Sequence, residues 1–143
     1  MAEFESARTL PGSPEIAFHL LQEAPRTGGW LPLRMAFDPL PDGGLRLTGR
    51  VLDREVDREL LYRAEPGQRR LEWTVAGADS CTGWFQVADS ASGTSEVTAH
   101  LSVLGEWEER LDPRDAERLR GLLDETVGAL EAEVRARADL AQG

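Results

Sequence analysis

The chain has 143 residues, 41% of them hydrophobic, and a formal net charge of −10. A chain of this length favours a single domain, here residues 1–143, which buries about two-thirds of its unfolded surface. The acidic balance argues against nucleic acids and anionic membranes as partners, because neither would meet a basic surface. No apolar run approaches the ~18 residues of a membrane span.

The single cysteine, Cys81, excludes an internal disulfide framework and a thiolate zinc site. The two histidines, His19 and His100, are dispersed and show no metal-ligand spacing, so the sequence predicts neither a metal nor a cofactor. Residues 1–5 lack the basic and apolar regions of a signal peptide, and we therefore expect a cytoplasmic protein.

The first elements in chain order are a strand and a short helical region. Residues 4–10 form a mixed run typical of a strand, and Pro11 to Pro14 then breaks it. Ser13 predicts a helix cap with Pro14 at the first helical position, and the helix should run to about Glu23. Residues 24–29 are turn-rich and suit a further helical turn.

The following seventy residues alternate between apolar and polar positions, and turn-forming residues separate the runs. Half-polar alternation is typical of an antiparallel sheet with one solvated face. The sequence shows no internal repeat and no linker. The predicted strands are residues 33–37, 45–51, 55–64, 69–76, 81–88 and 95–104.

A long helix is predicted for residues 112–141, with Asp112 as its cap and Pro113 at its first position. Gly121 and Gly128 lie opposite its apolar stripe, where they soften the outer face or allow close packing by another chain. The helix is the only predicted element long enough to cover the dry face of the sheet. The stripe consists of Ala116, Leu119, Leu123, Val127, Leu130 and Val134.

The order of elements resembles the START-like, Bet v 1-like superfamily, which includes the polyketide cyclase/dehydrase and lipid transport group. The matching features are residues 13–18 after the first strand, residues 30–32, residues 70–73 after a Pro-Gly turn, and residues 93–98. The long C-terminal helix completes the likeness. The resemblance implies an α+β helix-grip fold: a curved seven-stranded antiparallel sheet around the C-terminal helix, with two short helices after the first strand. It also implies a cavity between sheet and helix that takes lipids, polyketides or other apolar molecules.

Arg58 is the most informative polar residue. A two-residue hairpin turn at Pro66-Gly67 would place Tyr62 opposite Leu71, Leu60 opposite Trp73 and Arg58 opposite Val75. Arg58 would then lie on the covered face, where a guanidinium needs a partner and suits a carboxylate, phosphate or phenolate of a ligand. Alternatively, Arg58 lies near a strand end and reaches water, or a bulge turns it outward.

The predicted site is a set of apolar side chains on the covered face, with Arg58 as polar anchor. Tyr62 and Trp73 offer a phenol and an indole N–H that could orient a polar ligand atom, although such residues more often belong to a core. The predicted ligand-binding residues are Phe37, Leu47, Arg58, Leu60, Tyr62, Leu71, Trp73, Phe85, Leu101, Leu119, Leu123, Val127 and Leu130.

Two further features lie outside this set. Trp84 has the opposite parity to Phe85 and Val87, so we expect it on the outer face, where it could mark a contact surface. Residues 105–109 carry one tryptophan, Trp107, among acidic residues. The segment could be a lid or a partner contact, or simply a solvated loop with a packed tryptophan.

Three functions remain open at this point. The first is non-covalent binding of a small hydrophobic ligand between sheet and helix. The second is a polyketide cyclase- or aromatase-type enzyme, in which Arg58 and Tyr62 polarise a carbonyl or enolate of a chain held in a folded conformation. The third is a protein adaptor similar to the Hsp90-activator branch of the superfamily, with a partner bound on the outer face around Trp84 and His100.

Overall fold

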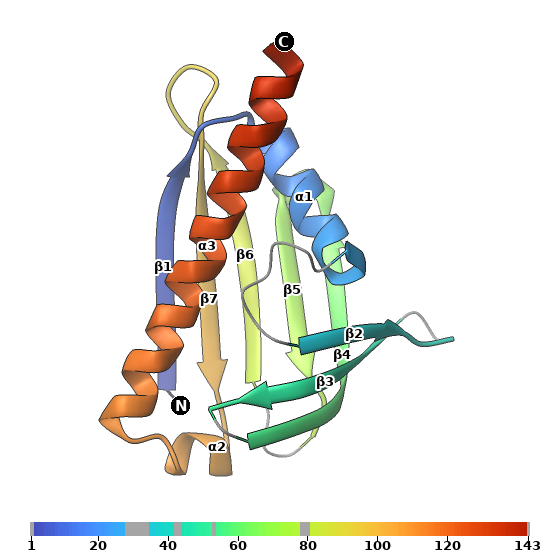
Figure 1. Ribbon diagram of the computed structural model, residues 1–143, viewed down its shortest axis with the longest axis vertical. Coiled ribbons are helices and arrows are strands. Elements are labelled where there is room, and N and C mark those ends of the chain that lie inside the picture. The colour runs from blue at the N-terminus through green and yellow to red at the C-terminus, as the bar shows by residue number, and fades with distance from the viewer. Residues whose placement is uncertain (1, 28–34, 42–43, 53, 78–80, 143) are drawn as a thin grey trace.

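The computed structural model describes residues 2–27, 35–41, 44–52, 54–77 and 81–142. Within these residues, one antiparallel sheet carries a long C-terminal helix across one face, and a shorter helix packs beside it (Figure 1). We call the face towards the helices the inner face. The predicted helix-grip α+β architecture is confirmed.

The sheet has the strand order β1-β7-β6-β5-β4-β3-β2, so β1 and β2 are its edges. The chain leaves β1 through a helix, enters the sheet at the opposite edge, and then adds each strand beside the previous one. The elements are β1 (Ala2–Leu10), α1 (Pro14–Thr27), β2 (Met35–Pro39), β3 (Leu45–Val51), β4 (Arg54–Glu65), a 3₁₀ turn (Pro66–Gln68), β5 (Arg70–Val75), β6 (Cys81–Asp89), β7 (Ser95–Val103), α2 (Glu106–Glu109) and α3 (Pro113–Gln142).

Helices α1 and α3 begin where the sequence predicts. The backbone N–H of Asp115 donates to Oδ1 of Asp112 at 2.8 Å, and that of Ile16 donates to Oγ of Ser13 at 3.4 Å. These caps satisfy backbone N–H groups that have no partner inside the helix.

The helical region after β1 differs from the prediction of two short helices. The described residues hold one helix of 14 residues, α1, which continues past Glu23 to Thr27. Pro25 lies in its last turn, where the missing N–H removes a single backbone hydrogen bond, so the helix does not end there. Residues 28 and 29 lie outside the described part of the chain.

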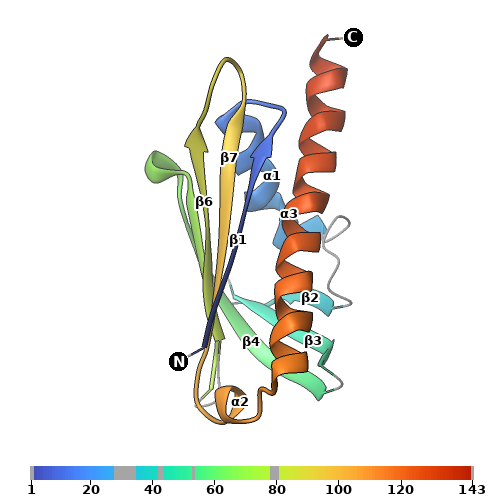
Figure 2. The same ribbon diagram turned by 90° about the vertical axis from the view of Figure 1, so that its left-hand side faces the viewer.

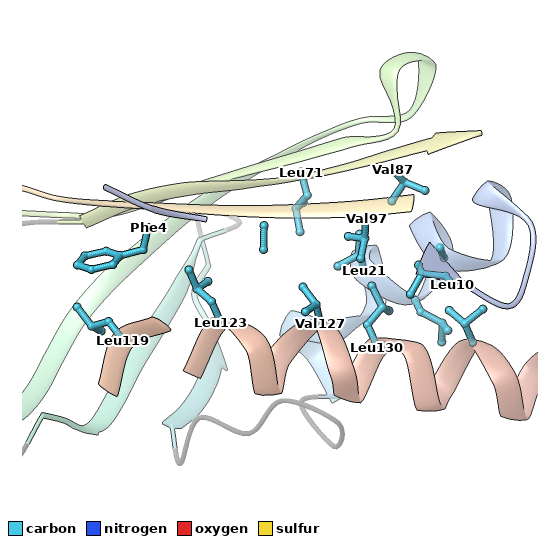
Figure 3. Packing of buried hydrophobic residues seen from close by; sticks show 14 of the residues in the cluster. Phe4, Leu10, Leu21, Leu71, Val87, Val97, Leu119, Leu123, Val127 and Leu130 are labelled. Atoms are coloured by element: carbon cyan, nitrogen blue, oxygen red, sulfur yellow. The ribbon is translucent and has the colours of Figure 1, made fainter. Parts of the chain in front are cut away.

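The main core lies between α3 and the strands beside the β1 edge. Leu119, Leu123, Val127 and Leu130 of α3 point towards the sheet (Figure 3). Val127 and Leu130 have 0% exposure, as does Leu21 of α1, which packs in the same cluster. The predicted apolar stripe therefore faces the sheet.

A second core cluster lies under the strands near the β2 edge, where the sheet curves (Figure 2). It consists of Leu45, Leu47, Val56, Leu60 and Val75. Helix α3 packs mainly against β1, with β7 beside it, so these strands carry their own apolar cluster. Three half-buried side chains pack against both clusters and connect them: Tyr62, Cys81 and Trp107.

Within the described residues, no helix combines the length and apolarity needed to cross a bilayer.

Candidate ligand site on the inner face

The predicted register between β4 and β5 is wrong by two residues. Tyr62 pairs with Trp73 and Leu60 with Val75, because the connection is a 3₁₀ turn rather than a two-residue hairpin. Arg69 closes this turn in the left-handed conformation (φ 50°), and its N–H donates to the carbonyl oxygen of Pro66 at 3.2 Å. A shift of two residues keeps every side chain on the same face of the sheet, so the faces predicted from the sequence are correct although the register is not.

Arg58 lies on the inner face, opposite Leu47 of β3. Its Nη1 donates to the carbonyl oxygen of Ala76 at 3.1 Å, and its guanidinium carbon lies 5.6 Å from the ring centroid of Trp107. A β-carbon at position 77 would lie 1.9 Å from this Nη1, and Gly77 has φ +127°, so glycine makes room for the guanidinium. The structure thus favours the covered-face alternative for Arg58, and its role in binding stays a prediction.

Four large inner-face side chains are only half-buried, although they lie on the covered side of the sheet: Tyr62, Trp73, Phe85 and Leu101. A side chain on a covered face that keeps part of its surface exposed borders on space that solvent can enter. The structure therefore brings these four predicted residues together beside the border between the two core clusters.

Trp73 rests against the backbone of the neighbouring strand. It pairs with Gly83 of β6, and a β-carbon at position 83 would lie 2.3 Å from Cζ2 of Trp73 and 2.6 Å from the carbonyl oxygen of His100. The missing side chain at Gly83 allows the indole to lie close to the sheet. Glycine inside a strand often marks such an approach, which is the sequence signal that could have located this ring.

The remaining predicted lining residues belong to packed regions. Val127 and Leu130 are completely buried, and Leu71, Leu119 and Leu123 are buried in the same cluster. They support the site from behind and present little free surface. Leu47 and Leu60 are buried in the second cluster. The side chain of Phe37 lies outside the described residues, while its backbone pairs with Leu47.

Two residues that sequence reasoning left out of the site, Cys81 and Trp107, pack with these side chains. Burial raises the pKa of the Cys81 thiol from 9.0 to about 12, and the nearby positive charge of Arg58 opposes this rise. The thiol is therefore neutral at physiological pH, and Cys81 contributes an apolar surface rather than a nucleophile.

The outer face carries the predicted Trp84, but its ring is not freely exposed. It stacks on His100, with centroids 5.1 Å apart and planes 7° apart, and the guanidinium carbon of Arg70 lies 4.5 Å from its centroid. The side chain of His100 is 15% exposed, and its Nδ1 lies 3.3 Å from Oε2 of Glu5. His100 is therefore largely covered by these neighbours.

A surface hollow of about 320 Å³ lies between α1 and α3, lined by Glu15, Ile16, His19, Leu20 and Arg137. His19 is exposed there. None of the predicted ligand-binding residues lines this hollow. Among the described residues, no group of three or more His, Cys, Asp or Glu side chains is arranged to hold a metal ion.

Gly128 has a specific neighbour, which corrects its assignment to the outer face. A β-carbon at position 128 would lie 2.7 Å from Nη1 of Arg8, and that guanidinium pairs with Glu131 at 3.3 Å. Gly128 thus allows β1 to approach α3 through Arg8. Gly121 has no atom within 4 Å of such a β-carbon, which agrees with an outward position.

A family model described as polyketide cyclase / dehydrase and lipid transport matches residues 1–135. The match covers most of the chain, and the protein belongs to this family. No match was found among curated proteins.

Solved structures agree on the fold. The ZhuI aromatase/cyclase from a Streptomyces species superposes with a TM-score of 0.78 at 13% identity, over 99% of this chain and 98% of that one. A protein from Thermus thermophilus gives 0.76 at 13% identity, over 95% and 99%. A START superfamily protein from Mycobacterium smegmatis gives 0.67 at 14% identity, over 94% and 97%.

Proposed function

We propose that the protein binds a small hydrophobic ligand, such as a lipid, a polyketide or an aromatic metabolite, between the inner face of the sheet and α3. The observation that carries this proposal is the group of half-buried inner-face side chains, Tyr62, Trp73, Phe85 and Leu101, beside the border of two core clusters. Filling the adjoining space with an apolar molecule would remove their remaining apolar surface from water, which favours binding.

Arg58 supplies a polar end to this site. Its guanidinium is held by the carbonyl oxygen of Ala76 and by the ring of Trp107, so its position is set before a ligand arrives. A carboxylate, phosphate or phenolate on the ligand would be oriented towards it. The matched family supports a ligand of this general kind.

Ligand uptake is tested by native mass spectrometry of the purified protein and by titration with a fluorescent fatty acid. We expect a saturable complex. Leu101→Trp should weaken it strongly by filling the space, whereas Leu61→Trp, at a position 50% exposed, is the matched control. A protein that carries no ligand and takes up no probe would contradict the proposal.

An enzyme of the cyclase or aromatase type is the second candidate, and the likeness to an aromatase/cyclase favours it over the adaptor. Arg58 and Tyr62 share the inner face of β4 but are four residues apart, which is about 13 Å along a strand. The two side chains therefore suit separate groups of an extended substrate better than one carbonyl. Arg58→Ala and Tyr62→Phe should each abolish turnover of a poly-ketone while the far-UV circular dichroism stays unchanged, and unchanged turnover in both would remove this site assignment.

A further inference from the structure

The connection between β7 and α3 contains a single helical turn, α2, which lies beyond the ends of β1 and β7 (Figures 1 and 2). Gly105 precedes it with φ 69° and ψ −141°, a backbone conformation that favours glycine. None of the four residues of α2 is fully buried, and its first residue follows a position without a side-chain cap hydrogen bond. A helix of one turn has little stability of its own, so α2 depends on its contacts with the body of the protein.

Trp107 makes the contact that bears on the ligand site. Its half-buried side chain packs against both core clusters, among the same residues that include Tyr62 and Cys81. The guanidinium of Arg58 lies over its ring at 5.6 Å. The indole therefore lies where the two clusters meet on the inner face, and it covers one face of the polar anchor.

The ring of Trp107 is not the sole support of Arg58, because Nη1 of Arg58 also donates to the carbonyl oxygen of Ala76, the residue that follows β5. If the indole moved out, the guanidinium would stay on the inner face and present the surface that the ring had covered. Rotation about Gly105 can move α2 without breaking a strand pair, because β7 ends at Val103 and α3 begins at Pro113.

We propose that α2 is the gate of the inner-face site and that Trp107 is its closing residue. This inference rests on the proposed function, since a gate has a role only if a ligand enters. With α2 open, an apolar ligand reaches the space beside Tyr62 and Trp73, and a planar or anionic group on it replaces the indole on Arg58. Trp107 thereby restricts entry to ligands whose polar end competes with a cation–π contact.

The chain's only cysteine makes this gate measurable without knowledge of the ligand. Cys81 packs against the same two core clusters as Trp107, and Arg58 lies near both residues, so opening α2 should expose the thiol to a reagent such as 5,5′-dithiobis(2-nitrobenzoate) at pH 8. We expect slow modification of the wild-type protein and acceleration of at least about tenfold in Trp107→Ala, because truncating a packed tryptophan removes more packing energy than this factor needs. Trp84→Ala, on the outer face, is the matched control and should leave the rate close to that of the wild type.

Denaturant separates local opening from global unfolding. Gate opening exposes little surface, so the modification rate should change little at low urea, whereas exposure through global unfolding should rise steeply. Equal rates in the wild type, Trp107→Ala and Trp84→Ala would overturn the gate, and so would a wild-type rate with the denaturant dependence of global unfolding. If Trp107→Ala fails to fold, Trp107→Leu keeps an apolar filling and gives the same comparison.

The result also separates the gate from the function. One outcome is that Trp107→Ala exposes Cys81 while neither the variant nor the wild type takes up a fluorescent fatty acid. In that case α2 is mobile, and the proposed ligand-binding function is wrong. Uptake of the probe with unchanged Cys81 rates gives the opposite result, a ligand site that is entered by another route.

Discussion

The two ends of the inner face are built differently, although the same strands run through both. At the α1 end, Leu21, Val97 and Leu130 have 0% exposure, and α1 packs on the sheet beside α3. At the α2 end, Leu101 keeps part of its surface exposed, and a guanidinium and a thiol lie among the apolar side chains. The difference shows that α3 alone does not decide where the core is filled, because its apolar stripe continues through both ends. The covering by α1 distinguishes the closed end from the other, because Leu20 and Leu21 of α1 pack in the main core cluster there.

Truncation of leucines should test the difference in packing between the two ends most directly. Leu130→Ala removes a completely buried side chain and should cost about 3 kcal/mol, whereas Leu101→Ala, at a half-buried position, should cost about half as much. Urea denaturation of the two variants measures the difference. Equal losses would show that the α2 end is packed as tightly as the α1 end.

Glycine substitutions test how closely the indole of Trp73 packs on β6. Gly83→Ala should cost roughly 1–3 kcal/mol, because its β-carbon would meet both the indole of Trp73 and a backbone oxygen. The near-ultraviolet circular dichroism should change as the ring moves. Gly67→Ala, whose β-carbon would have nothing within 4 Å, is the matched control. A loss of stability at Gly67 as large as that at Gly83 would remove the steric explanation.

A polar atom at the closed end should be dispensable. Oγ of Ser95 is completely buried and, among the described residues, is the one buried side-chain polar atom without a hydrogen-bond partner. Ser95→Ala should therefore raise the free energy of unfolding by about 1 kcal/mol. Ser6→Ala is the contrast, because it removes a hydroxyl that donates to Oδ1 of Asp124 at 2.5 Å and should not stabilise the protein. Destabilisation by Ser95→Ala would reveal a partner for the hydroxyl.

The last predicted effect concerns pH and is absent at neutral pH. The pKa of the Cys81 thiol is raised from 9.0 to about 12, so the unfolded chain loses this proton at a lower pH than the folded protein does. Stability should be unaffected by this group below pH 9 and should fall as pH rises from about 9 towards 12. The difference in unfolding free energy between the wild type and Cys81→Ala isolates the contribution. A difference that is independent of pH in this range would show that the thiol is not buried.

The facing of the strands could be predicted because alternation is a local property. The predicted position of Arg58 on the inner face is correct although the predicted hairpin register is wrong, because an error of two residues leaves every side chain on the same face. The turn itself was missed, since a left-handed Arg69 gives no sequence signal of the kind that glycine gives.

Contacts between distant segments could not be predicted in this way. The packing of Arg8 against Gly128 joins β1 to α3, and that of Trp107 against Arg58 joins α2 to β4. Neither pair is related by a helical or strand period, so only the folded chain brings it together. The resemblance to a known family predicts the architecture. The difference between the filled and the half-open end is visible only in the exposure of the side chains in the folded chain.

The position of β1 has a consequence for how the chain folds. Among the described strands, this first strand pairs with β7 alone, and its inner face supports α3 through Ser6 and Arg8. Its partner β7 is the last strand in the sequence, so β1 cannot pair until the rest of the sheet-forming sequence is present. The first strand in the sequence thus pairs with the last one. Although β1 is an edge strand, its removal would therefore also remove the strand on which α3 packs.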